Sequence, residues 1–437
     1  MKQLYHIETY GCQMNVYDSE LVARILDNKD ISPTDSAEAA DYIFINTCSV
    51  RDKAELKVLN RLKHLEALKK KNTSLVIGVI GCMAQNLKEE ILENKPFVNF
   101  VLGPDSYGKL SALLDAEKPW EVKEVHTDLS KYETYDYIYP LRNGGNSAMI
   151  AIMRGCDKMC TFCIVPFTRG RERSKSAESV VNEVKQAVAE GFREVTLLGQ
   201  NVNSYDDGDL KFPDLMERVA QIEGVKRIRF TSPHPQDASD ELIEVMLKYD
   251  NICNHIHLPL QSGSDSMLER MNRNYTKEEF ISLAEKFKKR IPGIAISTDI
   301  IVGFCGETEE EFSDTLDVVR RIKFDSAFMF KYSERPHTAA FKRMPDDVPE
   351  ELKGERLTRL IELQKINALE INKKLVGKTL EVQIEKISKK SDDHYIGRTD
   401  SNKLVVLPKN GKVPGDFLKA LITEAAGITL FGEPVSL

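Results

Sequence analysis

Three cysteines stand close together near the middle of the chain, directly after an apolar run. Cys156, Cys160 and Cys163 have the spacing C-x3-C-x2-C and follow SAMIAIM, which has the composition of a β-strand. A structural zinc site needs four ligands, but the nearest histidines, His126 and His234, are about 30 and 70 residues away. Three thiolates on a four-iron cubane leave one iron open. This central triad therefore favours an iron-sulfur cluster that binds a substrate or cofactor, over zinc or incidental thiols.

Three further cysteines, the N-terminal triad, each follow one of the first three strand-like segments. Cys12, Cys48 and Cys82 lie in TYGCQMN, INTCSVR and VIGCMAQ, about 35 residues apart. Parallel strands end at a common edge where ligands bind, so we expect these thiols to meet and to hold a second cluster. Taken singly, each is more often a core residue. Cys253 and Cys305 lie alone, and the sequence assigns them no role.

Composition indicates a soluble globular protein of two or three domains. The chain has 437 residues, of which 41% are hydrophobic and 30% charged, and a formal charge of -7. No segment reaches the ~20 unbroken apolar residues of a membrane helix. The start, MKQLYHIETYGC, has no secretory apolar region, so we expect a cytoplasmic protein. That compartment keeps thiols reduced, which argues against a disulfide framework.

Positive charge gathers around the central triad of this acidic protein. Between Pro140 and Ser176, seven basic residues stand against two acidic ones, a local charge of +5. An anionic partner would suit this segment. A solvated run of charges that pairs with acidic neighbours is the alternative.

The alternation of strand-like and helix-like segments predicts an α/β protein of three parts. Residues 1–115 have the pattern of an open parallel sheet with helical crossovers. Residues 116–145 have the composition of a linker. Residues 146–374 hold six βα repeats, enough for a partial barrel, and end in a long charged helix. Five short strands predict a small antiparallel β-barrel over residues 375–437.

The longer motifs resemble a known family. C-x3-C-x2-C after the first strand of a (βα)6 series is the signature of the radical S-adenosylmethionine (SAM) superfamily, in which SAM chelates the open iron. YGCQMN, NTCSVR, GCMAQ, GCDKMCTFCIVP, LLGQNVNSY, LPLQSGSD and DIIVGFCGET resemble successive blocks of its methylthiotransferase family. The resemblance covers nearly the whole chain, including a C-terminal barrel similar to the RNA-binding TRAM domain.

This resemblance implies a transferase that converts an unactivated C–H bond into C–S–CH3. It implies two [4Fe-4S] clusters, one for radical generation on the central triad and one for sulfur handling on the N-terminal triad. One SAM would donate the methyl group and a second would supply the 5′-deoxyadenosyl radical. An electron donor such as flavodoxin or ferredoxin and a sulfur source are further implied partners, whose identities the sequence does not give.

Loops after the other strands supply candidate SAM contacts. Phe162 lies between two cysteines of the central triad, where such loops commonly place an aromatic against the cluster or the adenine. Glycine lets a backbone approach a ligand, and amides can hydrogen-bond it. Turn formation and loop packing are the alternatives at every position. The remaining candidates are Gly199, Gln200, Asn201, Gln261, Ser262, Gly263, Asp299 and Gly303.

The segment CIVPFTRGRERS resembles the MiaB-type tRNA enzymes of the family rather than those that act on a ribosomal protein. The resemblance implies N6-isopentenyladenosine beside the anticodon as substrate, its 2-methylthio derivative as product, and the anticodon stem-loop as partner. Arg169, Arg171 and Arg173 would contact phosphates of that stem-loop. Threonylcarbamoyl-adenosine in tRNA or a ribosomal-protein aspartate is the alternative substrate.

Two departures from the family pattern and two rival function classes remain. Cys305 stands where relatives usually have proline, and Lys175 where they often have arginine.

An electron-transfer protein would normally complete each cluster with four cysteines. A tRNA-binding module would have no use for six cysteines at strand ends.

Overall fold

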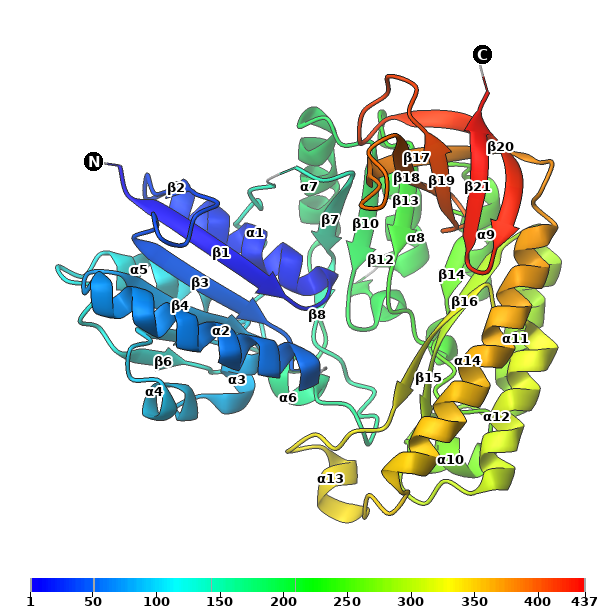
Figure 1. Cartoon of the computed structure of the whole chain (residues 1–437), viewed down its shortest axis with the longest axis horizontal. Coiled ribbons are helices and arrows are strands. Elements are labelled where there is room, and N and C mark those ends of the chain that lie inside the picture. Colours follow the sequence, from blue (N-terminus) through cyan, green and yellow to red (C-terminus); the bar gives the residue numbers. More distant parts are fainter. Residues whose placement is uncertain (1, 50–51, 143, 209, 436–437) are drawn as a thin grey trace.

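Three parts follow one another along the chain: a parallel sheet, an open barrel and a closed β-barrel (Figure 1). The computed structural model describes residues 2–49, 52–142, 144–208 and 210–435. Val50 and Arg51 of the motif NTCSVR, and Asn143 of the predicted linker, lie outside the described residues.

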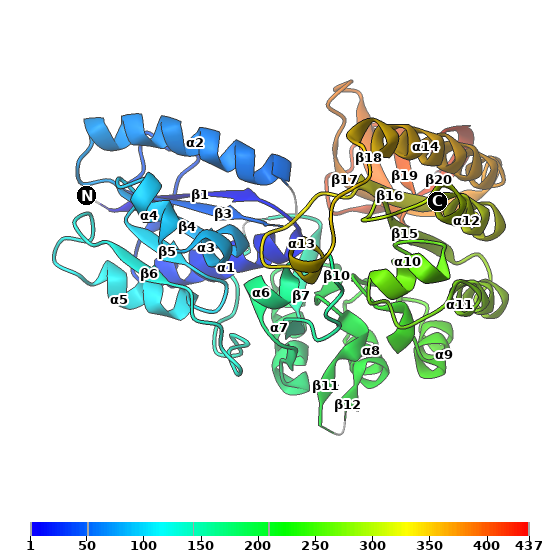
Figure 2. The ribbon, with the colours of Figure 1, turned by 90° about the horizontal axis from the view of Figure 1, so that it is seen from below.

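The N-terminal part is a parallel sheet with strand order β2-β1-β3-β4-β5-β6. Its two central strands, β3 and β4, are wholly buried, because helices cover both faces of a sheet of this kind. α1 and α2 lie on opposite faces (Figure 2). The elements are β1 (Leu4–Tyr10), α1 (Gln13–Asp27), β2 (Ser32–Pro33), β3 (Tyr42–Thr47), α2 (Asp52–Lys71), β4 (Val76–Gly81), α3 (Cys82–Leu87), α4 (Glu90–Asn94), β5 (Phe100–Leu102), η1 (Tyr107–Lys109), α5 (Leu110–Leu114) and β6 (Glu124–His126).

The segment predicted as a linker, residues 116–145, belongs in part to this sheet, so that expectation was wrong. β6 pairs in parallel with β5. Tyr135 is fully buried, and its hydroxyl donates to the carbonyl of Pro104 at 2.9 Å. A three-residue edge strand has no periodicity to read, and Tyr135 lies between tyrosines that are exposed. Single anchoring residues of this kind leave no sequence pattern.

The central part confirms the predicted series of six parallel strands. They form two triplets, β13-β10-β7 and β14-β15-β16, linked by a bridge between Ile228 and Ile252. The arc is open between its outer strands, β7 and β16. The strands are β7 (Ser147–Ala151), β10 (Glu194–Leu198), β13 (Arg227–Phe230), β14 (His255–His257), β15 (Ala295–Val302) and β16 (Ser326–Lys331).

Helices cover the outer face of this arc. Several start at a hydroxyl residue whose side chain accepts from a backbone N–H of the first turn, as Thr276 and Thr308 do at α11 and α12. The main helices are α7 (Ala177–Ala189), α8 (Phe212–Ala220), α9 (Asp240–Lys248), α11 (Lys277–Arg290), α12 (Glu309–Ile322) and α14 (Glu350–Lys373). Shorter elements of the loops are β8 (Met153–Arg154), α6 (Val165–Arg169), β9 (Arg173–Ser174), η2 (Val202–Ser204), β11 (Asp206–Asp207), β12 (Leu210–Lys211), η3 (Pro235–Asp237), α10 (Asp265–Arg270) and α13 (Ala339–Arg343).

The C-terminal part is the expected five-stranded barrel, closed in the order β17-β18-β19-β21-β20. One pair, β19 and β21, is parallel, so the barrel is not purely antiparallel. Two arginines of β13, Arg227 and Arg229, donate to backbone carbonyls of this barrel. It is therefore fixed at the end of the arc opposite the central triad (Figure 1). The strands are β17 (Thr379–Ile387), β18 (His394–Thr399), β19 (Leu404–Pro408), β20 (Phe417–Ala426) and β21 (Thr429–Pro434).

The N-terminal part packs against the open side of the arc. Ala151 of β7 and Leu198 of β10 share an apolar core with α1. Beside this core, the fully buried carboxylate of Asp18 on α1 accepts from Arg154 and Arg169, each at 2.8 Å. Burial raises the pKa of Asp18, but the two arginines outweigh that effect and lower it below its usual value. A buried, doubly paired carboxylate thus joins the two parts.

We expect Asp18→Asn to destabilise the protein by about 3 kcal/mol, because it leaves two buried arginines without their counter-charge. Since the folded pKa of Asp18 lies below the unfolded value of about 3.9, its stabilisation is complete above that pH and is lost as the pH falls through the folded pKa. The difference in melting temperature between the two proteins should therefore be constant from about pH 5 to 8 and shrink in more acidic solution. Asp157→Asn, which removes an exposed partner of Arg171, is the control and should change stability little.

Candidate active site

The three cysteines of the N-terminal triad lie at the carboxyl ends of adjacent strands, as the sequence predicts. Cys12 precedes α1, Cys48 follows β3, and Cys82 begins α3 after β4. A hydrogen bond with Cys48 and the nearby charge of Arg169 lower the pKa of the Cys12 thiol to about 5. Burial raises the pKa of Cys82, while Arg169 opposes that rise. The three thiols and one arginine therefore share one electrostatic environment.

Two asparagines that sequence reasoning did not single out fix these strand ends. The Asn15 side chain lies 3.3 Å from the Cys12 sulfur and donates to the Asn46 side chain at 2.9 Å. Asn46 in turn donates to the backbone carbonyl of Asn15 at 2.8 Å. A Cβ at Gly81, which has φ +90°, would lie 2.4 Å from Asn46 Oδ1. Both asparagines stand in the cysteine motifs, three residues after Cys12 and two before Cys48, which is the signal that could have revealed them.

The central triad lies in a loop closed by the pairing of β8 with β9. The N–H of Cys156 donates to the carbonyl of Gly170 at 3.1 Å, and the N–H of Gly155 donates to the Gln200 side chain at 2.5 Å. Burial raises the pKa of both Cys156 and Cys163 to about 12, and charge on Cys160 adds to the rise. The thiols are therefore close enough to affect one another, and burial favours their neutral forms.

Arg273 is a cation in contact with the central triad, and sequence reasoning missed it. Its Nη1 lies 3.3 Å from the Cys160 sulfur, and its Nη2 donates to the carbonyl of Pro259 at 3.1 Å. Its Nε donates to the Tyr275 hydroxyl at 3.0 Å. Arg273 thus ties the central triad to the loop that follows β14. Its segment, MNRNY, carries no cysteine and no glycine that would mark it.

Helix α6 connects the two triads. It begins two residues after Cys163 and contacts α3, whose first residue is Cys82. Arg169, at its last position, is buried beside Cys12 and Cys82 and bonds Asp18 through Nη2. Its Nη1 is buried and has no hydrogen-bond partner among the described residues. An unpaired buried donor beside thiols fits an additional anionic group at this place.

The donor sets fit iron-sulfur clusters better than single ions. Across the part of the chain that is described, no three His, Cys, Asp or Glu side chains converge on one metal ion. A zinc ion draws its sulfur ligands to within about 2.3 Å of one centre. The thiolates of a cubane each ligate a separate iron and so stand farther apart. Each triad offers three thiols beside a buried arginine, so its cysteines are the residues that would hold such a cluster.

The structure corrects two of the three arginines predicted to contact RNA phosphates. Arg169 and Arg173 are buried, and their charges are neutralised by Asp18 and Asp105 respectively. Neither side chain is at the surface to meet a phosphate. Arg171 is exposed and pairs with Asp157 at 3.2 Å. Lys175, the other departure from the family pattern, is buried too and donates to Glu183 at 2.7 Å.

The predicted SAM contacts divide into two groups. Gly263 lies against α12, where a Cβ would come within 2.6 Å of the Thr315 Cα, and the Ser262 hydroxyl lies 3.2 Å from that of Thr315. A Cβ at Gly303 would lie 2.3 Å from Lys353 of α14. Helix packing accounts for the residue types at these three positions, and their contact with SAM stays a prediction.

The other predicted contacts surround the strand ends near the central triad. Gln200 accepts from Gly155, and Gly199 lies against Met153. The oxygens Asn201 Oδ1 and Gln261 Oε1 are buried and have no partner within the described ranges. Phe162 packs edge-on against Phe304, and Asp299 lies 3.3 Å from His257. These residues stay candidates for SAM binding: Phe162, Gly199, Gln200, Asn201, Gln261 and Asp299.

The two lone cysteines are buried. Cys305 lies in an apolar cluster with Phe162, Phe304 and Tyr332. Burial raises the pKa of this thiol. Cys253 lies near Arg229, at the opposite end of the arc, where burial raises its pKa to about 12. Neither belongs to a triad.

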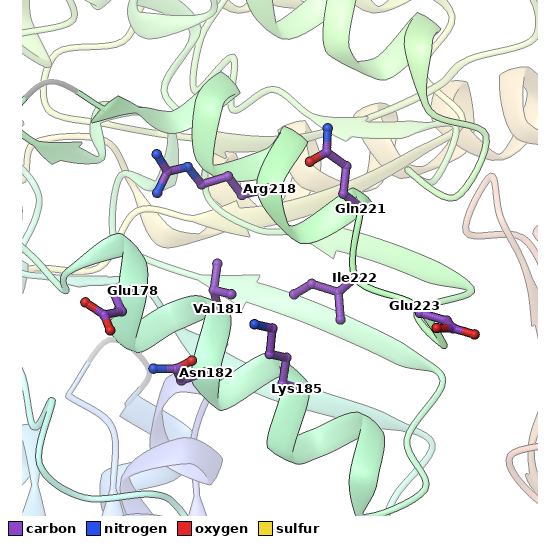
Figure 3. Close-up of a pocket in the computed structure, with 8 residues that line it drawn as sticks. All are labelled: Glu178, Val181, Asn182, Lys185, Arg218, Gln221, Ile222 and Glu223. Carbon is purple, nitrogen blue, oxygen red and sulfur yellow. The ribbon is translucent and has the colours of Figure 1, made fainter.

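A hollow of about 750 Å³ lies between α7 and α8, on the outer, helical side of the arc (Figure 3). Its lining includes Glu178, Lys185, Arg218 and Glu223, which carry charges of both signs. Both triads lie at the carboxyl edges of the strands, so this hollow is separate from them.

Three family profiles match consecutive parts of the chain. "Uncharacterized protein family UPF0004" matches residues 4–103, "Radical SAM superfamily" residues 150–319 and "TRAM domain" residues 373–435. A tRNA-2-methylthio-N(6)-dimethylallyladenosine synthase of Porphyromonas gingivalis is 51% identical, over 99% of this chain and 95% of the relative. Its counterpart in Chloroherpeton thalassium is 48% identical, over 99% and 96%. The chain belongs to this synthase family.

Membership of this family confirms the resemblance seen in the cysteine motifs. It makes the protein a radical SAM enzyme that uses S-adenosylmethionine and [4Fe-4S] as cofactors. Among solved structures, the radical SAM methyltransferase TsrM of Kitasatospora setae has a TM-score of 0.58 at 13% identity, over 78% of this chain and 77% of TsrM. That similarity supports the fold. No helix in the described ranges is long and apolar enough to cross a membrane.

We expect Arg273→Ala to slow the cleavage of SAM to 5′-deoxyadenosine about tenfold to hundredfold. The substitution removes the cation beside Cys160 and the tie to Pro259, and supporting residues of metal ligands typically have effects of this size. The measurement is 5′-deoxyadenosine formed by the reconstituted enzyme under reducing conditions. Arg290→Ala, which breaks an exposed pair with Glu244, is the matched control. Equal rates for the two variants would contradict a role for Arg273.

Proposed function

We propose that this protein converts N6-isopentenyladenosine next to the tRNA anticodon into its 2-methylthio derivative, by inserting sulfur and a methyl group at C2 of the adenine. The observation that carries this proposal is the placement of two three-cysteine sets around α6, each beside a buried arginine. Relatives of 51% and 48% identity bear the corresponding synthase name.

In this proposal the central triad binds the [4Fe-4S] cluster that holds SAM, and the N-terminal triad binds a second [4Fe-4S] cluster. When bound, these groups supply the radical and sulfur chemistry of the reaction. The chain's own residues hold and orient them. Arg273 and Arg169 each place a positive charge beside one triad, which favours the thiolate forms that ligate iron.

An apolar cluster adjoins the loop of the central triad. Phe162, between Cys160 and Cys163, packs in a cluster with Phe304, Cys305, Tyr332 and other apolar residues. A surround of this kind limits the access of water, and a reactive species formed there is then protected from side reactions. This function does not require Cys305 to react, because its thiol is buried.

The partners of this reaction are a tRNA anticodon stem-loop, an electron donor such as flavodoxin or ferredoxin, and a source of sulfur. Arg171 stays the exposed arginine of the three predicted to meet RNA phosphate. Within the N-terminal triad, Cys12 is exposed whereas Cys48 and Cys82 are buried. Sulfur would therefore reach the second cluster from the side of Cys12. A cytoplasmic location, where tRNA and these donors meet, also belongs to the proposal.

Replacing each triad separately tests the assignment of the two clusters. With all three cysteines of the central triad changed to serine, we expect no 5′-deoxyadenosine and no methylthio product. With the N-terminal triad changed, we expect 5′-deoxyadenosine to persist but the methylthio product to disappear. Each change should lower the iron content from about eight to about four atoms per chain. Cys253→Ser, a buried cysteine outside both triads, is the control.

Mass analysis of tRNA provides the test of the substrate. A strain without this gene should accumulate N6-isopentenyladenosine in its tRNA, and the intact gene should restore the 2-methylthio form. Unchanged 2-methylthio-isopentenyladenosine in the deletion strain would refute the proposed substrate. 5′-Deoxyadenosine made by the central-triad variant would refute the assignment of the radical cluster.

We expect Arg171→Ala to reduce the salt dependence of stem-loop binding. A lost phosphate contact lowers the slope of log affinity against log salt by about one. The measurement is fluorescence anisotropy of a labelled stem-loop over a series of salt concentrations. Arg193→Ala provides the control, because Arg193 is also an exposed arginine but donates to backbone carbonyls at the end of α7 and just after it. An unchanged slope would remove Arg171 from the RNA interface.

A further inference from the structure

Two phenylalanines of β16 are exposed, although they lie on the inner face of the arc. Phe328 is 56% exposed and Phe330 is 39% exposed. β16 is an outer strand of the arc, and its only strand neighbour among the described residues is β15. Exposed aromatic pairs are costly in water, because each ring leaves a large apolar area uncovered. This pair therefore calls for an occupant.

Strand alternation and contacts place both rings on the inner face. Met329, between them, packs against the core that the outer helices cover. Phe328 contacts the ring of His257 edge to face, with 6.1 Å between ring centroids, although β15 lies between their strands. His257 lies 3.3 Å from Asp299. An apolar surface thus adjoins a polar pair inside the arc.

The same segment runs between the two triads. Tyr332, two residues beyond Phe330, packs against Phe304 at 4.9 Å and shares a cluster with Phe162 of the central triad loop. Arg335 lies close enough to Cys48 of the N-terminal triad for their charges to interact. The chain after β16 then crosses toward α6 and the N-terminal part (Figure 2). A group seated on Phe328 and Phe330 therefore lies near the approach to both triads.

We infer that Phe328 and Phe330 bind the isopentenyl chain of the target adenosine. This inference rests on the proposed function and adds the residues that select the prenylated base. The chain is a branched, apolar hydrocarbon without hydrogen-bonding groups, so an aromatic surface suits it and each buried carbon group favours binding. The purine that carries it has polar edges, and His257, which contacts Phe328, offers a polar pair with Asp299 beside that ring.

The two rings would select a prenylated adenosine over an unprenylated one. A target adenosine without the prenyl group would leave both rings exposed and would gain nothing from them. Discrimination by an apolar pocket grows with each hydrocarbon group, and a single methylene is worth about tenfold to two-hundredfold. Neither ring belongs to a triad or to its loop, so their loss should alter substrate choice more than SAM cleavage.

Equilibrium binding of two synthetic stem-loops tests this inference. One carries N6-isopentenyladenosine at the target position and the other carries adenosine, and both are titrated against the reconstituted holoenzyme. We expect the parent enzyme to favour the prenylated RNA by about tenfold or more. The double variant Phe328→Ala and Phe330→Ala should bind the two RNAs with affinities within about twofold of each other. Both affinities should match that of the parent enzyme for the unprenylated RNA.

Leu247→Ala is the matched control, because Leu247 is an exposed apolar residue on the outer helix α9. It should keep the parental preference. Formation of 5′-deoxyadenosine without RNA shows that the double variant still assembles its radical site. Equal affinities of the parent for both RNAs, or a preference retained by the double variant, would overturn the inference. Failure of the parent to form the methylthio product would instead overturn the proposed function.

Discussion

The buried carboxylate of Asp18 holds this structure together at the point where its chemistry would take place. It accepts from Arg154 and Arg169, which belong to a different part of the chain, at 2.8 Å each. Buried arginines cannot shed their charge and therefore require an anion within reach. The N-terminal part supplies that anion, so this ion cluster joins the part that carries the N-terminal triad to the part that carries the central triad.

The cluster also explains why so much positive charge lies beside the central triad. Arg173 pairs with Asp105, and Lys175 and Arg142 pair with Glu183, all of them buried. These cations serve the interface inside the protein rather than a partner outside it. Arg169 is the exception, since it also affects two thiols of the N-terminal triad. The Arg169 side chain therefore both joins the two parts and places a positive charge beside the N-terminal triad.

The arrangement separates the site of chemistry from the C-terminal barrel. Both triads lie at carboxyl ends of strands, where parallel sheets commonly place their ligands. Arg227 and Arg229 fix the closed barrel at the amino ends. An RNA that touches both must therefore extend along the arc, past its open side. The exposed rings of Phe328 and Phe330 lie on the inner face of the strand that borders that side.

The sequence by itself determined the main strands and helices and the position of the six triad cysteines at strand ends. Parallel strands end at one edge, and Cys12, Cys48 and Cys82 each follow such a strand. Tertiary structure alone decided which arginines are buried. The carboxylates that neutralise Arg169 and Arg173 lie 151 and 68 residues earlier in the chain. The same holds for Gly263, whose neighbour is the backbone of α12, and for Arg273, whose partner Cys160 lies 113 residues away. Local patterns report backbone periodicity, whereas the partner of a buried charge depends on how distant elements pack.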